Sequence, residues 1–225
     1  MRARYRPSDN PFPGEGSGYA AAMSTPHEIA ADLLDRAGTT YAADAGITMK
    51  DTPKPLFQLL VLCMLASKPI GADIAVAAAR ELFHAGLRTP EAVLDADRRT
   101  MIDAFGRAGY ARYDESSATR LTEMAQRVQE RYHGDLRTLA EAGDRDVGHV
   151  ARLLQEFTGI GPTGADIFLR EVQAVWPWVA PFFDERARSC AADLGLPTDT
   201  AELADLAPRR TAELAAALVR TALDR

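Results

Sequence analysis

The segment FTGIGPTGAD, residues 157–166, carries the pattern that decides the fold: a helix, a tight turn with two glycines, and a second helix from about Pro162. Gly159 and Gly161 permit a positive φ and lack a Cβ, so the backbone can approach a ligand closely. The N–H groups that open the second helix suit a phosphate oxygen. We expect Ile160 to pack between the two helices and hold the turn closed. On its own, this pattern is equally typical of an ordinary turn between helices.

The rest of the chain is helical in pattern as well. Residues 56–65 are hydrophobic on nearly every side, which predicts a buried central helix. Further helices are predicted over residues 25–37, 71–83, 89 onward, 112–132, 135–140, 146–157, 163–175, 184–194, 200–206 and 208–223. The first opens with a capping box formed by Thr25 and Glu28. Because no segment alternates with a period of two for long, we expect an all-α fold with no sheet. A dinucleotide-binding fingerprint is therefore excluded, since it requires a strand before its glycines.

Composition narrows the class of protein. The chain has 225 residues, of which 47% are hydrophobic, and a formal net charge of −6, a globular balance without a general attraction for polyanions. Its two cysteines, Cys63 and Cys190, exclude a disulfide scaffold and a four-cysteine metal or iron–sulfur site. The histidines show no metal-ligand spacing, so we expect no metal. The longest apolar run is too short to cross a bilayer, and no signal peptide is visible. We expect a cytoplasmic protein without membrane contact, in which residues 1–22 form a flexible tail.

A second motif, FFDER at residues 182–186, places Asp184 at the start of a helix. The preceding loop, residues 176–181, is apolar, aromatic and stiffened by proline. Such surroundings partly desolvate a carboxylate and hold it in a fixed position. Considered without the glycine turn, the motif is better explained as a helix N-cap with no further duty.

Taken together, the buried helix at residues 55–67, the glycine turn at 159–161 and Asp184 resemble the helix-hairpin-helix superfamily of DNA glycosylases, and within it the endonuclease III-like branch. The resemblance covers roughly residues 50–192. It implies a two-lobed, all-α DNA glycosylase fold with a DNA cleft between the lobes. The implied lobes are a central one over residues 53–175, with the hairpin at 157–166, and a second one over residues 23–50 plus 176–225.

The same resemblance implies roles for individual residues. It makes Asp184 the catalytic aspartate and the hairpin amides phosphate ligands, with a monovalent cation on the hairpin carbonyls and no iron–sulfur cluster. Thr163 stands where bifunctional members carry the lysine that forms a Schiff base. This implies a monofunctional enzyme that uses water as its nucleophile. The candidate DNA contacts are Gly159, Ile160, Gly161, Thr163, Gly164 and Lys68, and the pocket candidates are Ser67, Phe183 and Arg186.

We therefore expect a monomeric enzyme of base excision repair that hydrolyses the N-glycosidic bond of a damaged or mismatched base in double-stranded DNA. The alternative is a non-catalytic helix-hairpin-helix protein that binds DNA or another protein. Residues 151–190 contain four arginines and five acidic residues, which favours the alternative, whereas Asp184 favours the enzyme. A carboxylate at this position that opens into a groove supports catalysis. One held in a salt bridge by Arg186 or Arg188 is only a cap.

Overall fold

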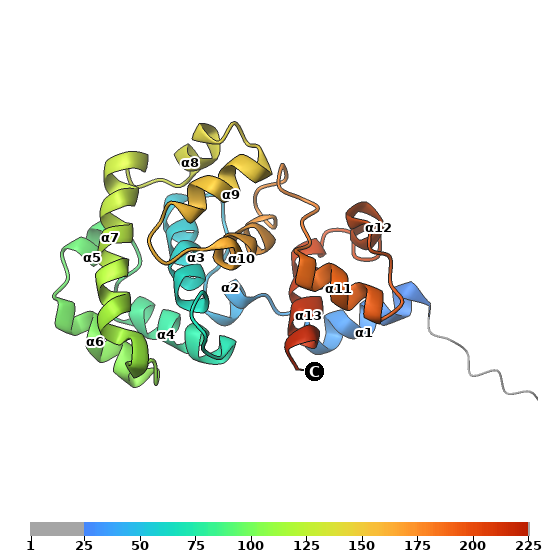
Figure 1. Cartoon of the computed structure of the whole chain (residues 1–225), viewed down its shortest axis with the longest axis horizontal. Helices are drawn as coiled ribbons and strands as arrows, with labels where there is room; N and C mark the ends of the chain where they lie inside the picture. Colours follow the sequence, from blue (N-terminus) through green and yellow to red (C-terminus); the bar gives the residue numbers. More distant parts are fainter. Residues whose placement is uncertain (1–24, 225) are drawn as a thin grey trace, which may run out of the picture.

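Helix α3 (Pro53–Ala66) lies at the centre of the molecule, as Figure 1 shows. The computed structural model describes residues 25–224. All ten residues from Leu56 to Leu65 are buried, as their apolar character on every side predicted. α3 contacts α4 (Ala72–His84) on one side and α10 (Pro162–Val172) on another. The glycine turn that precedes α10 is therefore held close to the core of the molecule.

All regular structure in residues 25–224 is helical, and no strand occurs among them. This confirms the prediction of an all-α fold. The remaining elements are α1 (Pro26–Ala37), α2 (Tyr41–Asp44), α5 (Pro90–Leu94), α6 (Arg98–Arg107), the 3-10 helix η1 (Ala111–Tyr113), α7 (Asp114–Tyr132), α8 (Arg137–Ala142), α9 (Val147–Gln155), α11 (Glu185–Asp193), α12 (Thr200–Asp205) and α13 (Thr211–Leu223).

The helices form two groups, which lie on opposite sides of the view in Figure 1. In the smaller group, α13 contacts both α1 and α11, and α12 lies on the same side. In the larger group, α7 contacts α5 and α6, α6 contacts α4, and α9 contacts α8 and α10. α10 also contacts α13, so this helix joins the two groups. The tail predicted over residues 1–22 lies outside the described residues.

Local capping sets the helix starts that the sequence predicted best. The Thr25 side chain accepts the N–H of Glu28, and the Glu28 carboxylate accepts the N–H of Thr25 at 2.7 Å, which is the predicted capping box. Thr89 likewise accepts the N–H of Ala92 at the start of α5. Both helices have a proline in the first turn, where no amide hydrogen is needed.

One short helix was not predicted, and several predicted helix boundaries are wrong. The segment around α2 was expected to be a loop, but Thr40 caps a short helix there whose first amides meet a buried acceptor on α10. α8 begins at Arg137 instead of residue 135, because the Asp135 carboxylate accepts the Arg137 N–H and so precedes the helix. α13 begins at Thr211 instead of residue 208, because Arg209 has a φ of 68°, which is not helical.

Candidate functional site

The predicted helix-turn-helix at residues 157–166 is present as the connection between α9 and α10. Gly159 has a φ of +95°, in the region that favours glycine. A Cβ on this residue would lie 3.0 Å from Cδ of Arg120 and 3.4 Å from Cγ of Met64. Ile160 is buried, so its side chain holds the turn against the core, as predicted. It is consequently no DNA contact through its side chain.

Gly161 does not adopt the positive φ that its residue type permits. Its φ of −98° and ψ of −169° are extended, a conformation that any residue adopts. A Cβ here would meet no atom within 4 Å. Gly161 is the N-cap of α10 without a side-chain cap, and within residues 25–224 no hydrogen bond to the N–H of Thr163 or Gly164 is formed. The start of α10 therefore offers free amide donors beside an open position.

The two glycines are expected to respond oppositely to alanine. Gly159→Ala lowers the free energy of unfolding by about 1–2 kcal/mol, because an L residue is strained at this φ. Gly161→Ala leaves it unchanged or raises it by up to about 1 kcal/mol, because the backbone already has an ordinary conformation. Urea denaturation of the two variants and the parent protein measures both values. Equal losses in the two variants would contradict the assigned conformations.

The Cα of Gly164 packs against the end of α3, so this residue can contact a ligand only through its backbone N–H. It is buried, and a Cβ there would lie 2.4 Å from Oγ of Ser67 and 3.0 Å from Cγ2 of Ile160. The Ser67 hydroxyl donates a hydrogen bond to the carbonyl of Cys63 at 2.7 Å. The missing side chain of Gly164 thus lets α10 approach the end of α3 closely.

A groove of about 1600 Å³ lies between the two groups of helices. Five of the predicted site residues line it: Ser67, Lys68, Thr163, Asp184 and Arg186. The groove lining does not include Gly159, Ile160, Gly161, Gly164 or Phe183. Phe183 is buried in the hydrophobic core, so its assignment to a base pocket is wrong. The end of α3, the start of α10 and the start of α11 thus meet at one groove, although they are far apart in the sequence.

Asp184 is both an N-cap and a member of a buried ion pair. One carboxylate oxygen accepts the N–H of Ala187 at 2.9 Å, and the other accepts Nη1 of Arg170. The aspartate is 8% exposed and the arginine 3%. Its partner is therefore neither of the two arginines considered from the sequence, since Arg188 pairs with Glu185. Asp184 therefore forms a buried ion pair with Arg170 at the groove wall.

Asp166 is a second carboxylate of the groove, and sequence reasoning assigned it no role. It lies three residues after Thr163 and four before Arg170, so the three side chains share one face of α10. That spacing is the signal that could have identified it. Partial burial, together with the negative charge of Asp184, raises the pKa of Asp166, and Arg170 opposes the rise. The groove therefore contains one carboxylate paired with an arginine and another with an increased tendency to hold a proton.

Arg170 and its neighbour Glu171 hold the groove wall in place through contacts in the protein interior. The Glu171 carboxylate accepts the N–H groups of Tyr41 and Ala42 at 3.3 and 2.8 Å, and Nε of Arg170 lies 3.9 Å from it. Burial raises the pKa of Glu171, whereas Arg170 and the two amides counteract the rise. The guanidinium of Arg170 lies 5.7 Å from the centre of the Tyr41 ring. Asp184 is thus held by a buried network that begins on α2.

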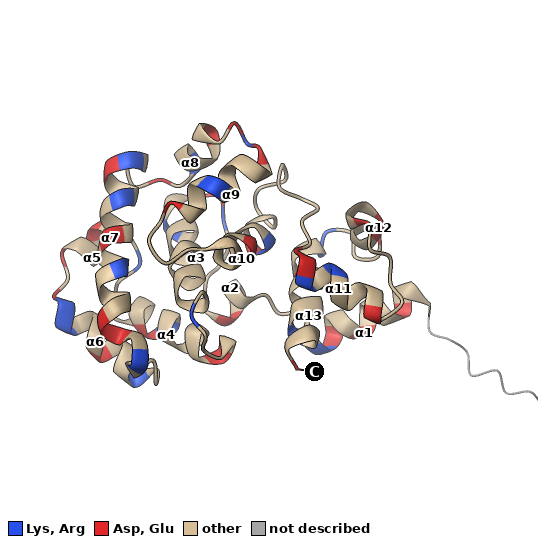
Figure 2. Cartoon of the chain, in the orientation of Figure 1, with Lys and Arg blue, Asp and Glu red and all other residues tan. Residues whose placement is uncertain are grey.

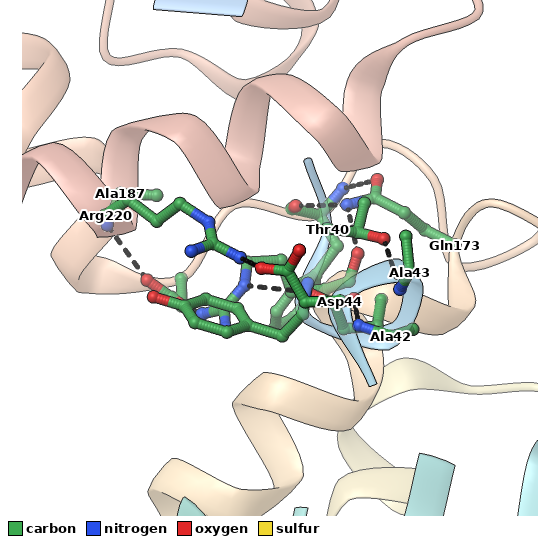
Figure 3. Close-up of polar contacts among 12 residues, drawn as sticks. Thr40, Ala42, Ala43, Asp44, Gln173, Ala187 and Arg220 are labelled. Atoms are coloured by element: carbon green, nitrogen blue, oxygen red, sulfur yellow. Dashed lines mark hydrogen bonds and ion pairs between the residues drawn. The ribbon is translucent and has the colours of Figure 1, made fainter. Parts of the chain in front are cut away.

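The same network reaches α13 and the loop before α11. Arg220 pairs with Asp44 (Figure 3). It also donates to the carbonyl of Thr39. The side-chain amide of Gln173 donates to the carbonyl of Phe182 at 2.8 Å and accepts its N–H at 2.9 Å. These two bonds of Gln173 fix the backbone at Phe182, two residues before Asp184. The position of this carboxylate is therefore set from several elements of the fold.

The groove has slightly more acidic than basic side chains. The basic residues that line it are Arg36, Lys68, Arg170, Arg186 and Arg220, and the acidic ones are Asp44, Asp73, Asp166, Asp184, Glu185, Asp193 and Asp224. Lys68 lies 5.6 Å from the centre of the Tyr113 ring, an arrangement that favours the cation. Figure 2 shows the wider distribution, with both signs of charge on both groups of helices.

No three histidine, cysteine, aspartate or glutamate side chains within residues 25–224 are grouped so that they could hold a metal ion. No helix in the same residues combines the length and apolar character that a membrane span requires. The chain matches no protein-family model, no curated protein and no solved structure.

Proposed function

We propose that this protein is a monofunctional DNA glycosylase that removes a damaged or mismatched base from double-stranded DNA. The observation that carries the proposal is the meeting of three separate segments at one groove: the end of α3 with Lys68, the start of α10 with Thr163, and Asp184. This arrangement agrees with the two-lobed helix-hairpin-helix fold that the sequence resembles. The enzyme would act as a cytoplasmic monomer, with a monovalent cation on the hairpin carbonyls.

In the proposed reaction the target nucleotide leaves the base stack and enters the groove, because its glycosidic bond is unreachable inside a duplex. When the N-glycosidic bond breaks, the bonding electrons leave with the base and positive charge develops on the sugar. The ionised carboxylate of Asp184 stabilises that charge. A water molecule then adds to the anomeric carbon, its proton is accepted by a base in the groove, and the departing base acquires a proton.

Asp166 suits the proton transfers of this reaction better than Asp184 does. Its raised pKa brings the carboxyl closer to the pH at which the protein works, where a proton carrier is most effective. Asp184 has both oxygens engaged by Ala187 and Arg170, so neither is free to take a proton without losing a bond. The two carboxylates therefore divide the work into charge stabilisation and proton transfer.

Phosphate contacts are proposed for the free amides at the start of α10. Anions bind at helix N-termini because several N–H groups point outward there, and such contacts position DNA without reading its sequence. Gly161→Val would place a side chain in the open space at this position without strain in the backbone. Weaker DNA binding with unchanged helicity is the expected result.

A second candidate function is a non-catalytic scaffold of the same shape. Two observations favour it: both oxygens of Asp184 are already engaged, and acidic side chains outnumber basic ones in the groove. A polyanion is bound mainly by lysine and arginine, so this groove has little excess charge for a duplex.

A panel of duplexes that carry single damaged or mismatched bases separates the two candidates. Release of a free base from at least one duplex, measured by chromatography, is the result expected of the enzyme. Binding to duplexes without release from any of them would leave the scaffold as the function. The uncleaved parent duplex without a lesion serves as the control.

Borohydride trapping is expected to yield no covalent protein–DNA adduct. An imine needs a primary amine at the position that Thr163 occupies, and the only lysine that lines the groove is Lys68. Release of the base should therefore leave an intact abasic strand, which gel electrophoresis detects before and after alkali. A trapped adduct that disappears in Lys68→Gln would show that a lysine serves as the nucleophile and would refute the assignment as monofunctional.

A further inference from the structure

A second cavity, of about 670 Å³, lies at the opposite end of α3 from the groove. It includes Thr52, Lys54 and Gln58 from the start of α3, whereas the groove includes Ala66 and Ser67 from its end. α3 has 14 residues, so the two ends are about 20 Å apart at a rise of 1.5 Å per residue. No residue lines both the cavity and the groove, although Ala45 of the cavity follows Asp44 of the groove in the chain.

The charged lining of this cavity is entirely basic. Lys50, Lys54, Arg80, Arg88 and His84 line it, and no aspartate or glutamate does. The chain as a whole carries a net charge of −6 and has only three lysines, two of which are here. A single cavity thus collects four permanent positive charges in an otherwise acidic protein, and the field inside it favours an anion.

None of these four cations forms a salt bridge within residues 25–224. Both arginines are oriented by bonds from Nε to the backbone, Arg80 to the carbonyl of Asp44 and Arg88 to that of Phe83. The outer nitrogens of each guanidinium remain for another acceptor. A pair of such groups matches the oxygens of a phosphate, to which arginine binds with two parallel hydrogen bonds.

Uncharged donors in the same cavity also lack acceptors. Gln58 lines it and is 7% exposed, and its amide makes no hydrogen bond with any described residue. The amide atoms are not among the fully enclosed side-chain atoms that lack a partner in residues 25–224, so they remain open to the cavity and can bond a group placed there. α3 also starts here, with no side-chain cap at Thr52, and the N–H of Lys54 in its first turn is left without an internal acceptor.

We propose that this cavity binds the phosphate groups of a small molecule, such as a diphosphate or a nucleotide. Lys50, Lys54 and the guanidinium groups of Arg80 and Arg88 neutralise the phosphate charge, and Gln58 donates to one of its oxygens. A small ligand fits better than a nucleic-acid strand, because the donors converge in one cavity instead of following a line over the surface. The inference is independent of the glycosylase proposal, since no residue that lines the cavity also lines the groove.

Titration calorimetry with inorganic pyrophosphate and with ADP, at constant ionic strength, tests the proposal. Saturable binding of one molecule per chain is expected for at least one of them. Lys50→Gln with Lys54→Gln should weaken it by at least about 10-fold, because two charge-assisted hydrogen bonds to the phosphate are lost. Arg99→Gln, a change at an arginine of α6 whose side chain is 89% exposed, is the matched control and should leave the affinity unchanged.

A second variant, Gln58→Leu, tests the cavity without changing its charge. Gln58→Leu removes the unpaired amide and replaces it with a side chain suited to the buried helix, so the protein should fold as well as the parent while binding of the probe weakens. Failure of both probes to bind, or affinity unchanged in the lysine variant and in Gln58→Leu, overturns the proposal. If neither probe binds but the lysine variant loses affinity for a short DNA duplex, the cavity contacts nucleic acid and the small-molecule assignment is wrong.

Discussion

Replacing Arg170 with methionine is expected to lower the free energy of unfolding by about 3–5 kcal/mol. The guanidinium is 3% exposed and pairs with Asp184 while lying beside Glu171. Its loss leaves two buried carboxylates without the positive charge that compensates them, and removal of one partner from a buried pair costs far more than the pair contributes. Methionine fills much of the same volume, so the loss comes from charge and not from a cavity.

Guanidinium denaturation of Arg170→Met measures this effect. Arg188→Met is the matched control: this arginine is exposed and pairs with Glu185 at the surface, where an ion pair contributes about 0–1 kcal/mol. Adding Asp184→Asn to Arg170→Met should restore part of the stability, since both members of the pair are then uncharged. If the single Arg170 variant unfolds at the same denaturant concentration as the Arg188 control, the buried network does not hold the groove wall together.

The pH dependence of the stability of Arg170→Met follows from the burial of Glu171. Burial raises the pKa of this carboxyl in the folded protein, so the unfolded state binds fewer protons between the ordinary pKa and the raised one. Stability therefore falls as the pH rises through that interval. Arg170 opposes the rise in pKa, so the decline should be steeper and extend to higher pH in Arg170→Met. Thermal unfolding between about pH 4 and pH 8 measures the two slopes, and parallel curves would contradict the assignment.

Loss of base release in Asp184→Asn is the second large effect. An amide still caps α11 by accepting the Ala187 N–H, but it carries no negative charge for the developing sugar cation. A decrease of at least about 100-fold in the rate is expected, on the scale of other electrostatic groups in active sites. The assay measures single-turnover release from the duplex that the parent protein processes.

Folding has to be controlled in this experiment, because Asp184→Asn also removes the closer of the two carboxylates that Arg170 faces. Denaturation of Asp184→Asn, and of the double variant with Arg170→Met, shows whether each is folded under the assay conditions, and a folded double variant should remain inactive. Asp166→Asn is the companion test: it should lower the rate and remove one step of the pH–rate profile, since Asp166 is assigned to proton transfer. Full activity in the folded double variant would show that Asp184 is a cap and an ion-pair partner only.

Much of the fold could be predicted because its signals are local. The apolar run from Leu56 to Leu65 identifies a buried helix without any information on its neighbours, and Thr25 with Glu28 specifies a helix start within four residues. The shape of α2 could not be found in this way. Its first amides are accepted by Glu171, about 130 residues away in the chain, and no local pattern records that partner.

In the candidate site, too, local features could be predicted and contacts between distant segments could not. The position of Asp184 at the start of a helix follows from its flanking residues, but its pairing with Arg170 depends on how α10 meets α11. Gly161 shows the opposite limit of local patterns, since its residue type permits a positive φ but its backbone is extended. The basic cavity was missed because its lysines and arginines come from three segments, none of which is rich in positive charge by itself.

The short connection between α1 and α3 has a mechanical consequence. Through α2 it is attached to α10 by the bonds to Glu171 and to α13 by the bonds of Arg220 to Asp44 and Thr39, so it ties the two groups of helices across the back of the groove. Any widening of the groove to admit a large ligand must stretch this connection. Its most exposed attachment is the ion pair of Arg220 and Asp44. Salt screens such a pair. A higher salt concentration should therefore weaken the attachment between the two groups of helices before it destabilises either group.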